Sequence, residues 1–226
     1  MFKSLFGNKT KSLDKDAPNL PFKVLLRRTR IVVIDDKVSE FPFKPLTNEG
    51  YSIVHWSDVE TLRTLEDGMF DIIILDINGV GRKLDSDNEG AGILRHLKDF
   101  NPSQIVIAYS GESHDPSRIQ FFQQADQFVP KPTNAITWKE ILDDLIKTKV
   151  NVNHYWNEAR RILLTEGLTE PQIEKLEKAI LAASKRGDTE IDLKSLVLES
   201  VGTVGKLANL LTVLGKVMAL LAPAGA

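Results

Sequence analysis

Arg30-Ile-Val-Val-Ile-Asp-Asp36 is a short apolar run that ends in two adjacent carboxylates. Runs that are rich in Ile and Val and do not alternate with polar residues are typical of parallel strands covered on both faces. The carboxyl ends of parallel strands meet at one edge of the sheet, where open α/β sheets bind ligands. Three later runs end in Asp76, Ser110 and Lys131, so we expect these side chains to lie beside Asp35 and Asp36. The three runs are Phe70-Asp-Ile-Ile-Ile-Leu-Asp76, Gln104-Ile-Val-Ile-Ala-Tyr-Ser110 and Gln127-Phe-Val-Pro-Lys131.

Strand-like runs occur five times, and helix-like segments lie between them. Apolar residues share one helical face in each such segment, as Val59, Leu62 and Leu65 do before Gly68. This alternation predicts an α/β fold, a doubly wound five-stranded parallel sheet over residues 30–148. The expected strands lie near residues 30–35, 51–56, 71–76, 104–109 and 126–130, and one of the expected helical faces spans residues 119–125.

The composition excludes several classes of site. At 226 residues, 42% of them hydrophobic, the chain can form one domain of ordinary size and a smaller one. It has no cysteine, which excludes thiol nucleophiles, thiolate metal sites and disulfides. The formal net charge is −2, but residues 1–30 carry eight basic side chains against two acidic ones. We expect residues 1–29 to be a basic flexible leader, and the polar sequence after Phe6 lacks a signal peptide, which predicts a cytoplasmic protein.

From about residue 149 the pattern changes to helices only, which predicts an all-α output or oligomerisation region over residues 149–226. Its third segment is expected to run from near Thr189, through two glycines, to about Leu221. This segment places a wide apolar face opposite a narrow polar stripe, so we expect an amphipathic helix that packs in a bundle, in a dimer or on a membrane surface. The stripe consists of Lys206, Asn209, Thr212 and Lys216.

The five polar residues at the strand ends favour phosphoryl chemistry. Adjacent carboxylates remain ionised most easily with a cation between them, and oxygen ligands with open water positions favour Mg²⁺. Asp76 could bind the cation with one oxygen and attack phosphorus with the other, because carboxylates are known nucleophiles in phosphoryl transfer. Lys131 would neutralise the transferred group, and the Ser110 hydroxyl would donate to one of its oxygens.

The Asp-Asp pair, the Ile-Leu-Asp and Ala-Tyr-Ser strand ends and the Lys-Pro pair, in this order, resemble the receiver domain of two-component response regulators. The resemblance covers residues 30–148 and implies a flavodoxin-like fold. It also implies Asp76 as the phospho-acceptor, Ser110 and Phe128 as the switch pair, and a cis bond between Lys131 and Pro132. The implied Mg²⁺ ligands are Asp35, Asp36, Asp76 and the backbone carbonyl of Asn78.

Two features depart from that family. The loop after Asp76, residues 77–90, is longer and more polar than usual, and it could tune phosphoryl access, bind a kinase or be a tolerated insertion. Pro42 and Pro45 lie where the first helix should run, so we expect that helix to be short or broken. Kinases dock on this helix in the family.

The favoured function is a phosphorylation switch and not an enzyme. A histidine kinase or phosphotransfer protein would phosphorylate Asp76, and the helical region would transmit the change by protein interaction or dimerisation. The alternatives are a Mg²⁺-dependent phosphohydrolase and a receiver-gated effector that meets a membrane surface. Against the phosphohydrolase, the sequence shows no general base for rapid turnover. It also has no second Asp two residues after the acid that ends the first strand, where phosphatases of the haloacid dehalogenase type carry one.

Other readings are weaker. The loop that begins at Asp85 starts like an EF-hand, but His96 stands where a bidentate Glu is required. His154 lacks the Lys three residues later that phosphotransfer helices commonly carry. Residues 149–226 carry ten basic and nine acidic side chains, so the sequence gives no clear sign of nucleic-acid binding.

Overall fold

A computed structural model describes residues 12–13, 20–37, 41–111, 123–186 and 192–222 of the chain. Five strands form one parallel sheet in the order β2-β1-β3-β4-β5. This order is that of the flavodoxin-like doubly wound sheet, so the predicted fold class is confirmed. The strands are β1 (Arg30–Ile34), β2 (Ser52–Trp56), β3 (Ile72–Asp76), β4 (Ile105–Ser110) and β5 (Gln127–Pro130).

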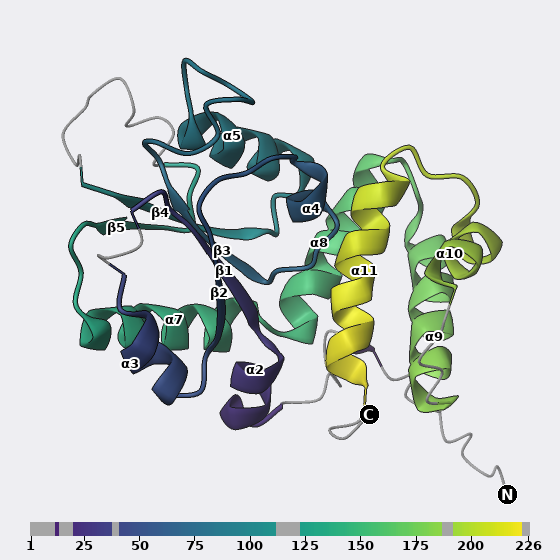
Figure 1. Cartoon of the computed structure of the whole chain (residues 1–226). Coiled ribbons are helices and arrows are strands. Elements are labelled where there is room, and N and C mark those ends of the chain that lie inside the picture. Colours follow the sequence, from purple (N-terminus) through teal and green to yellow (C-terminus); the bar gives the residue numbers. More distant parts are fainter. Residues whose placement is uncertain (1–11, 14–19, 38–40, 112–122, 187–191, 223–226) are drawn as a thin grey trace, which may run out of the picture.

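Helices cover both faces of this sheet (Figure 1). Val32 and Ile34 of β1 belong to a buried cluster with residues of α4 (Arg63–Glu66) and α5 (Gly90–Phe100). Ile31 and Val33 point to the opposite face and join a cluster with α3 (Phe43–Asn48) and α7 (Ala135–Lys149). The central strands are therefore covered on both faces, as their sequences predict. The edge strand β2 is covered less well, since its Val54 is 45% exposed.

The helices between the strands are uneven in length. The helix after β1, α3, has six residues and lies where Pro42 and Pro45 predict a short or broken helix. Of the expected helical face of Val59, Leu62 and Leu65, only Leu65 lies in a helix, the four-residue α4. Most of the helix expected over residues 119–125 lies outside the described residues.

The expectation of a flexible leader over residues 1–29 is wrong for its last part. Residues Phe22–Arg28 form helix α2, in which Leu25 is buried against the core. Leu13 is fully buried as well, and its backbone N–H donates to Glu177 of helix α9 (Glu170–Arg186) at 2.6 Å. This segment is basic, but Phe22, Leu25 and Leu26 recur at helical spacing and form an apolar stripe that the expectation overlooked.

The C-terminal region is helical, as predicted, but its last segment is not continuous. It divides at Gly202, whose φ is +81°, into α10 (Leu193–Val201) and α11 (Leu207–Leu221). Helix α11 runs alongside α8 (Val152–Thr165), and α9 and α10 lie beyond them (Figure 1). A glycine at a positive φ is a common point for a helix to end.

The apolar face of α11 lies inside this helical bundle. Leu210, Val213, Leu214, Val217 and Leu220 are at most 5% exposed and belong to the core cluster that includes α7 and α8. Of the three settings expected for this face, the structure therefore shows the bundle. No helix among the described residues is both long enough and apolar enough to cross a membrane.

Three residues of the expected polar stripe, Asn209, Thr212 and Lys216, face the receiver-like part of the chain, whereas Lys206, just before α11, is exposed. Asn209 donates to the carbonyl of Phe100, and Lys216 donates to the carbonyl of Phe70 and to the carboxylate of Asp71. These acceptors lie at the amino edge of the sheet, opposite the edge that carries Asp76. The helical region is thus fastened to the end of the sheet away from the expected phosphorylation site.

Candidate phosphoryl and metal site

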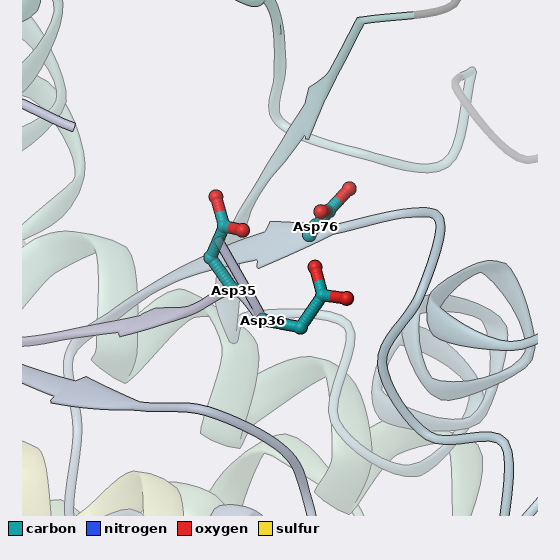
Figure 2. A group of neighbouring side chains, drawn as sticks. All are labelled: Asp35, Asp36 and Asp76. Carbon is teal, nitrogen blue, oxygen red and sulfur yellow. The ribbon is translucent and has the colours of Figure 1, made fainter. Parts of the chain in front are cut away.

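Three carboxylates meet at the carboxyl edge of the sheet, as the strand ends predict (Figure 2). Asp35 and Asp36 follow β1, and Asp76 is the last residue of the neighbouring strand β3. Each residue offers one oxygen, and these three atoms lie within 4.8 Å of one another. Asp35 is fully buried, Asp76 is 5% exposed and Asp36 is open to solvent. The arrangement could hold one divalent cation with a side open to water.

Lys131 joins two of these carboxylates. It follows β5, and its Nζ lies 2.6 Å from Asp35 Oδ2 and 2.7 Å from Asp76 Oδ2. The same ammonium lies 4.7 Å from the centre of the buried Tyr109 ring. The peptide bond between Lys131 and Pro132 is cis. The Lys131 ammonium is therefore held between Asp35 and Asp76 in a water-poor setting, where a charge acts strongly on its neighbours.

The pKa values follow from this geometry. Burial raises the pKa of Asp76 above its ordinary value and outweighs the hydrogen bonds from Lys131 and the Asn78 N–H, and repulsion from Asp35 adds to it. Burial alone would lower the pKa of Lys131, but its hydrogen bonds to Asp35 and Asp76 raise it overall. The site thus holds a firmly protonated Lys131 next to the Asp76 carboxylate, whose ionised form is disfavoured by burial. Additional positive charge at the site would favour the ionised form of Asp76.

Asn78 and Ser110 lie on the other side of Asp76. The Asn78 N–H donates to Asp76 Oδ1 at 3.0 Å, and its side-chain amide donates to Ser110 Oγ at 3.1 Å. Ser110 is fully buried at the end of β4. Phe128 is partly buried on β5 and packs against the cluster beneath α5. The carboxylate, amide, hydroxyl and lysine side chains expected at the phosphoryl site are therefore at this edge of the sheet, Phe128 lies within β5, and their roles remain predictions.

Sequence reasoning missed the residues that organise the loop over the site. Glu89 accepts a hydrogen bond from the Gly79 N–H at 2.6 Å, and Asp58 accepts one from the Gly81 N–H at 2.6 Å. A Cβ on Gly90 would come within 2.0 Å of the Asp76 carbonyl oxygen, so α5 begins in contact with the expected acceptor. The acidic composition of the loop was visible, but nothing in the sequence showed which acid would reach which backbone N–H.

The loop acids do not form the calcium site that their spacing suggests. Asp85 Oδ1 accepts hydrogen bonds from the backbone N–H groups of Asp87 and Asn88, and both of its oxygens accept from the Asn88 side chain. Within the described ranges, Asp35, Asp36 and Asp76 are the one group of three or more acids and histidines arranged to hold a metal ion. This donor set suits Mg²⁺, which binds through a few carboxylate oxygens and keeps several waters.

Comparison with known proteins gives a structural answer only. No protein-family model matches the chain, and no curated protein matches it. The receiver domain of NtrX from Brucella abortus aligns with 22% identity and a TM-score of 0.44 over 52% of this chain and 98% of that one. The structural neighbours are CheY-like receiver domains and NtrX response regulators. A CheY-like receiver protein from Methanospirillum hungatei JF-1 aligns with 22% identity and a TM-score of 0.46, covering 54% of this chain and 95% of that one.

A third receiver structure is the response regulator TrrA from Thermotoga maritima, in complex with Mg²⁺ and BeF. It aligns with 27% identity and a TM-score of 0.41 over 52% of this chain and 98% of that one. These alignments cover about half of this chain, and their TM-scores lie below 0.5. What the site does is therefore argued below from its own residues.

Proposed function

We propose that this protein is a phosphorylation switch of the response-regulator kind, in which Asp76 accepts a phosphoryl group. The observation that carries the proposal is the position of Lys131, whose Nζ lies within 2.7 Å of both Asp35 and Asp76. A lysine held beside a carboxylate nucleophile can neutralise the charge of an incoming phosphoryl group. Phosphoryl transfer depends mostly on such positioning and charge stabilisation.

The transfer step follows from the groups that face Asp76. One Asp76 oxygen would attack the phosphorus of a phosphohistidine whose other ring nitrogen is protonated, so that a P–O bond forms while the P–N bond breaks, its electron pair stays on the ring nitrogen and a neutral imidazole leaves. Lys131 and the Ser110 hydroxyl would donate to the phosphoryl oxygens. Asp35, Asp36, Asp76 and the Asn78 carbonyl would hold Mg²⁺, which when bound supplies charge neutralisation. The donor would be a histidine kinase or phosphotransfer protein.

The two groups that donate hydrogen bonds to the Asp76 carboxylate favour a phosphoryl group that is lost slowly, and not rapid enzymatic hydrolysis. Lys131 and the Asn78 N–H both donate hydrogen bonds to its carboxylate, and neither is a base that could activate water. A Mg²⁺-dependent phosphohydrolase would need such a base close to the phosphoryl group. We therefore propose a phospho-accepting protein that is not an enzyme in the usual sense, with the hydrolase as the alternative.

We also propose that the C-terminal helices read the state of the receiver domain. The argument is the position of β3, which carries Asp76 at its carboxyl end and lies next to Asp71, the residue that binds Lys216 of α11. A shift of β3 or its flanking loops would therefore strain contacts with α11. A second copy of the chain or a membrane surface would be a partner only after such a change, since the apolar face of α11 is buried here.

Intact mass after incubation with Mg²⁺ and acetyl phosphate tests the proposal. We expect one added phosphoryl group on the parent protein, none on Asp76→Asn and none when the metal is chelated. Asp87→Asn is the matched control, because Asp87 is an exposed acid of the same loop and should be phosphorylated as the parent is. If Asp76→Asn is labelled as well, Asp76 is not the acceptor.

A second measurement separates the switch from the hydrolase. Phosphate release from acetyl phosphate should proceed slowly relative to labelling if the protein is a switch. Sustained rapid release without an accumulated adduct would instead favour the hydrolase. Hydrogen exchange at residues 207–221, compared with and without beryllofluoride, then shows whether the C-terminal helices respond.

A further inference from the structure

Glu89 has an unusual backbone conformation next to the proposed phosphorylation site. Its φ is +51° and its ψ is −131°, and among the residues that the structure describes it is the one non-glycine residue with a positive φ. A side chain in this region costs about 1–3 kcal/mol and persists only when the surroundings hold it there. The strain marks Glu89 as a residue whose side chain makes compensating contacts.

Those contacts reach the backbone that follows Asp76. Glu89 Oε2 accepts the Gly79 N–H at 2.6 Å, and Oε1 accepts from Arg82 Nε at 2.8 Å. The Glu89 side chain is 16% exposed, while that of Arg82 is 67% exposed, so the contact with Gly79 is the better shielded of the two. One carboxylate therefore connects the start of α5 to the loop after the acceptor.

The segment that Glu89 holds lies directly against the carboxylate cluster. A Cβ built on Gly79 would come within 3.0 Å of Asp36 Oδ2. The preceding residue, Asn78, donates its N–H to Asp76. On the other side of Glu89, a Cβ on Gly90 would lie only 2.0 Å from the Asp76 carbonyl oxygen. Glu89 thus joins two backbone segments that both touch the site.

We propose that Glu89 is a positioning residue for the phosphoryl site. Its carboxylate fixes residues 78–79, and so sets the Asn78 carbonyl and the space around Asp36 for a divalent cation. The proposal rests on the function proposed above for the role of the cation, but the contact itself is a property of the metal-free protein. Partners of this kind, which orient the groups that bind a metal, typically affect its affinity by about 10–100-fold.

Four variants separate the side chain from the backbone strain. Glu89→Ala removes the carboxylate and keeps a Cβ at the positive φ, whereas Glu89→Gly removes both the carboxylate and the strain. Glu89→Gln keeps an oxygen that can accept the Gly79 N–H but removes the charge. Asp87→Asn removes one charge from the same loop, where the Asp87 side chain accepts only a 3.3 Å contact from Ser86.

Two readouts test the proposal. In metal-free protein, amide exchange at Gly79 should be faster in Glu89→Ala and Glu89→Gly and unchanged in the other two variants. Mg²⁺ affinity, measured by titration, should fall about tenfold in Glu89→Ala and Glu89→Gly and little in Glu89→Gln. A purely structural role predicts instead that Glu89→Gly, which relieves the strain, behaves as the parent does in both readouts.

The outcomes are distinguishable. Unchanged Gly79 exchange in Glu89→Ala and Glu89→Gly overturns the proposal, as does a Glu89→Gln variant that loses as much Mg²⁺ affinity as Glu89→Ala, because charge would then matter and not position. If the parent itself neither binds Mg²⁺ nor accepts a phosphoryl group, the proposed function fails, while the exchange at Gly79 still decides whether Glu89 holds the loop.

Discussion

Lys216 Nζ lies 2.7 Å from Asp71 Oδ1, and this ion pair connects the last described helix to the start of the central strand β3. Both side chains are largely buried, at 7% and 11% exposure. Lys216 also donates to the carbonyls of Gly68 and Phe70, and Asp71 Oδ2 accepts the Arg30 N–H, so both charged groups have several partners. The C-terminal region is therefore attached by a polar contact of defined geometry.

The first prediction concerns this ion pair. Lys216→Met should destabilise the protein by about 3–5 kcal/mol, because it leaves the Asp71 carboxylate buried without its cation. Burial lowers the pKa of Lys216, and Asp71 opposes that shift, so the charge of Lys216 depends on its partner. Denaturant unfolding at pH 7 measures the change, with the exposed Lys206→Met as the control.

A double-mutant cycle shows whether the two residues act as a pair. Asp71→Asn keeps an acceptor for the Arg30 N–H but removes the negative charge. In the double variant with Lys216→Met, the loss of stability should therefore be smaller than the sum of the two single losses. Additive losses would mean that the ion pair does not couple α11 to β3.

The second prediction uses Gly68, which lies under α11. Its φ is +71°, and an added Cβ would come within 2.6 Å of Thr212 Cγ2. Gly68→Ala should therefore destabilise the protein in two ways. A Cβ at a positive φ is strained, and its overlap with α11 should cost about a further 1–3 kcal/mol. Gly167→Ala is the matched control, since Gly167 has a φ of +83° and open space around its Cβ position.

Thr212→Ser provides the reverse test, because it removes Cγ2 and keeps the hydroxyl. Combined with Gly68→Ala, it should restore part of the stability, and combined with Gly167→Ala it should restore none. Equal losses in Gly68→Ala and Gly167→Ala, measured by thermal unfolding, would mean that α11 does not press on Gly68 in solution.

The sheet could be predicted because its strands carry their own signal. All five strands begin and end within one residue of the expected runs, since runs rich in Ile and Val have few other favourable settings than a covered parallel strand. Because parallel strands end at one edge of the sheet, the predicted strand ends were enough to place Asp76 and Lys131 side by side.

The role of α11 could not be predicted in the same way. The periodicity of Asn209, Thr212 and Lys216 shows that they share one face, and a polar face on a helix usually meets solvent. Here the acceptors are backbone carbonyls near residues 66–70 and 100, and a sequence does not show which carbonyls a fold leaves unpaired. The loop contact between Glu89 and Gly79 was missed for the same reason.

The third prediction concerns pH and Asp126. Burial is the largest effect on this carboxyl and would raise its pKa, but attraction to Lys98, hydrogen bonds from Lys149 and Lys98, and the Val106 N–H together lower it below 3.8. Because the folded pKa lies below the unfolded one, the stabilisation is present above pH 3.8 and is lost as the pH falls through the folded value.

Asp126→Asn should therefore be less stable than the parent by about 3 kcal/mol at pH 7, because Lys98 would be left without its buried partner. The difference should shrink as the pH falls below 3.8, which urea unfolding at several pH values can follow. The exposed Asp144→Asn is the control. A difference that stays constant down to pH 2.5, approximately, would mean that the ionised Asp126 does not supply this stability.

The fourth prediction concerns Mg²⁺ itself. The carboxylates of Asp35, Asp36 and Asp76 offer oxygens within 4.8 Å of one another, and burial and the repulsion of Asp35 both raise the pKa of Asp76. A bound cation would relieve this repulsion in the folded state alone, so Mg²⁺ at one hundred times its Kd should stabilise the protein by about 2.7 kcal/mol. Asp36→Asn removes the exposed ligand and should lose most of that gain. Thermal unfolding with Mg²⁺ and after chelation measures it, and an equal gain in the parent and Asp36→Asn would place the cation elsewhere.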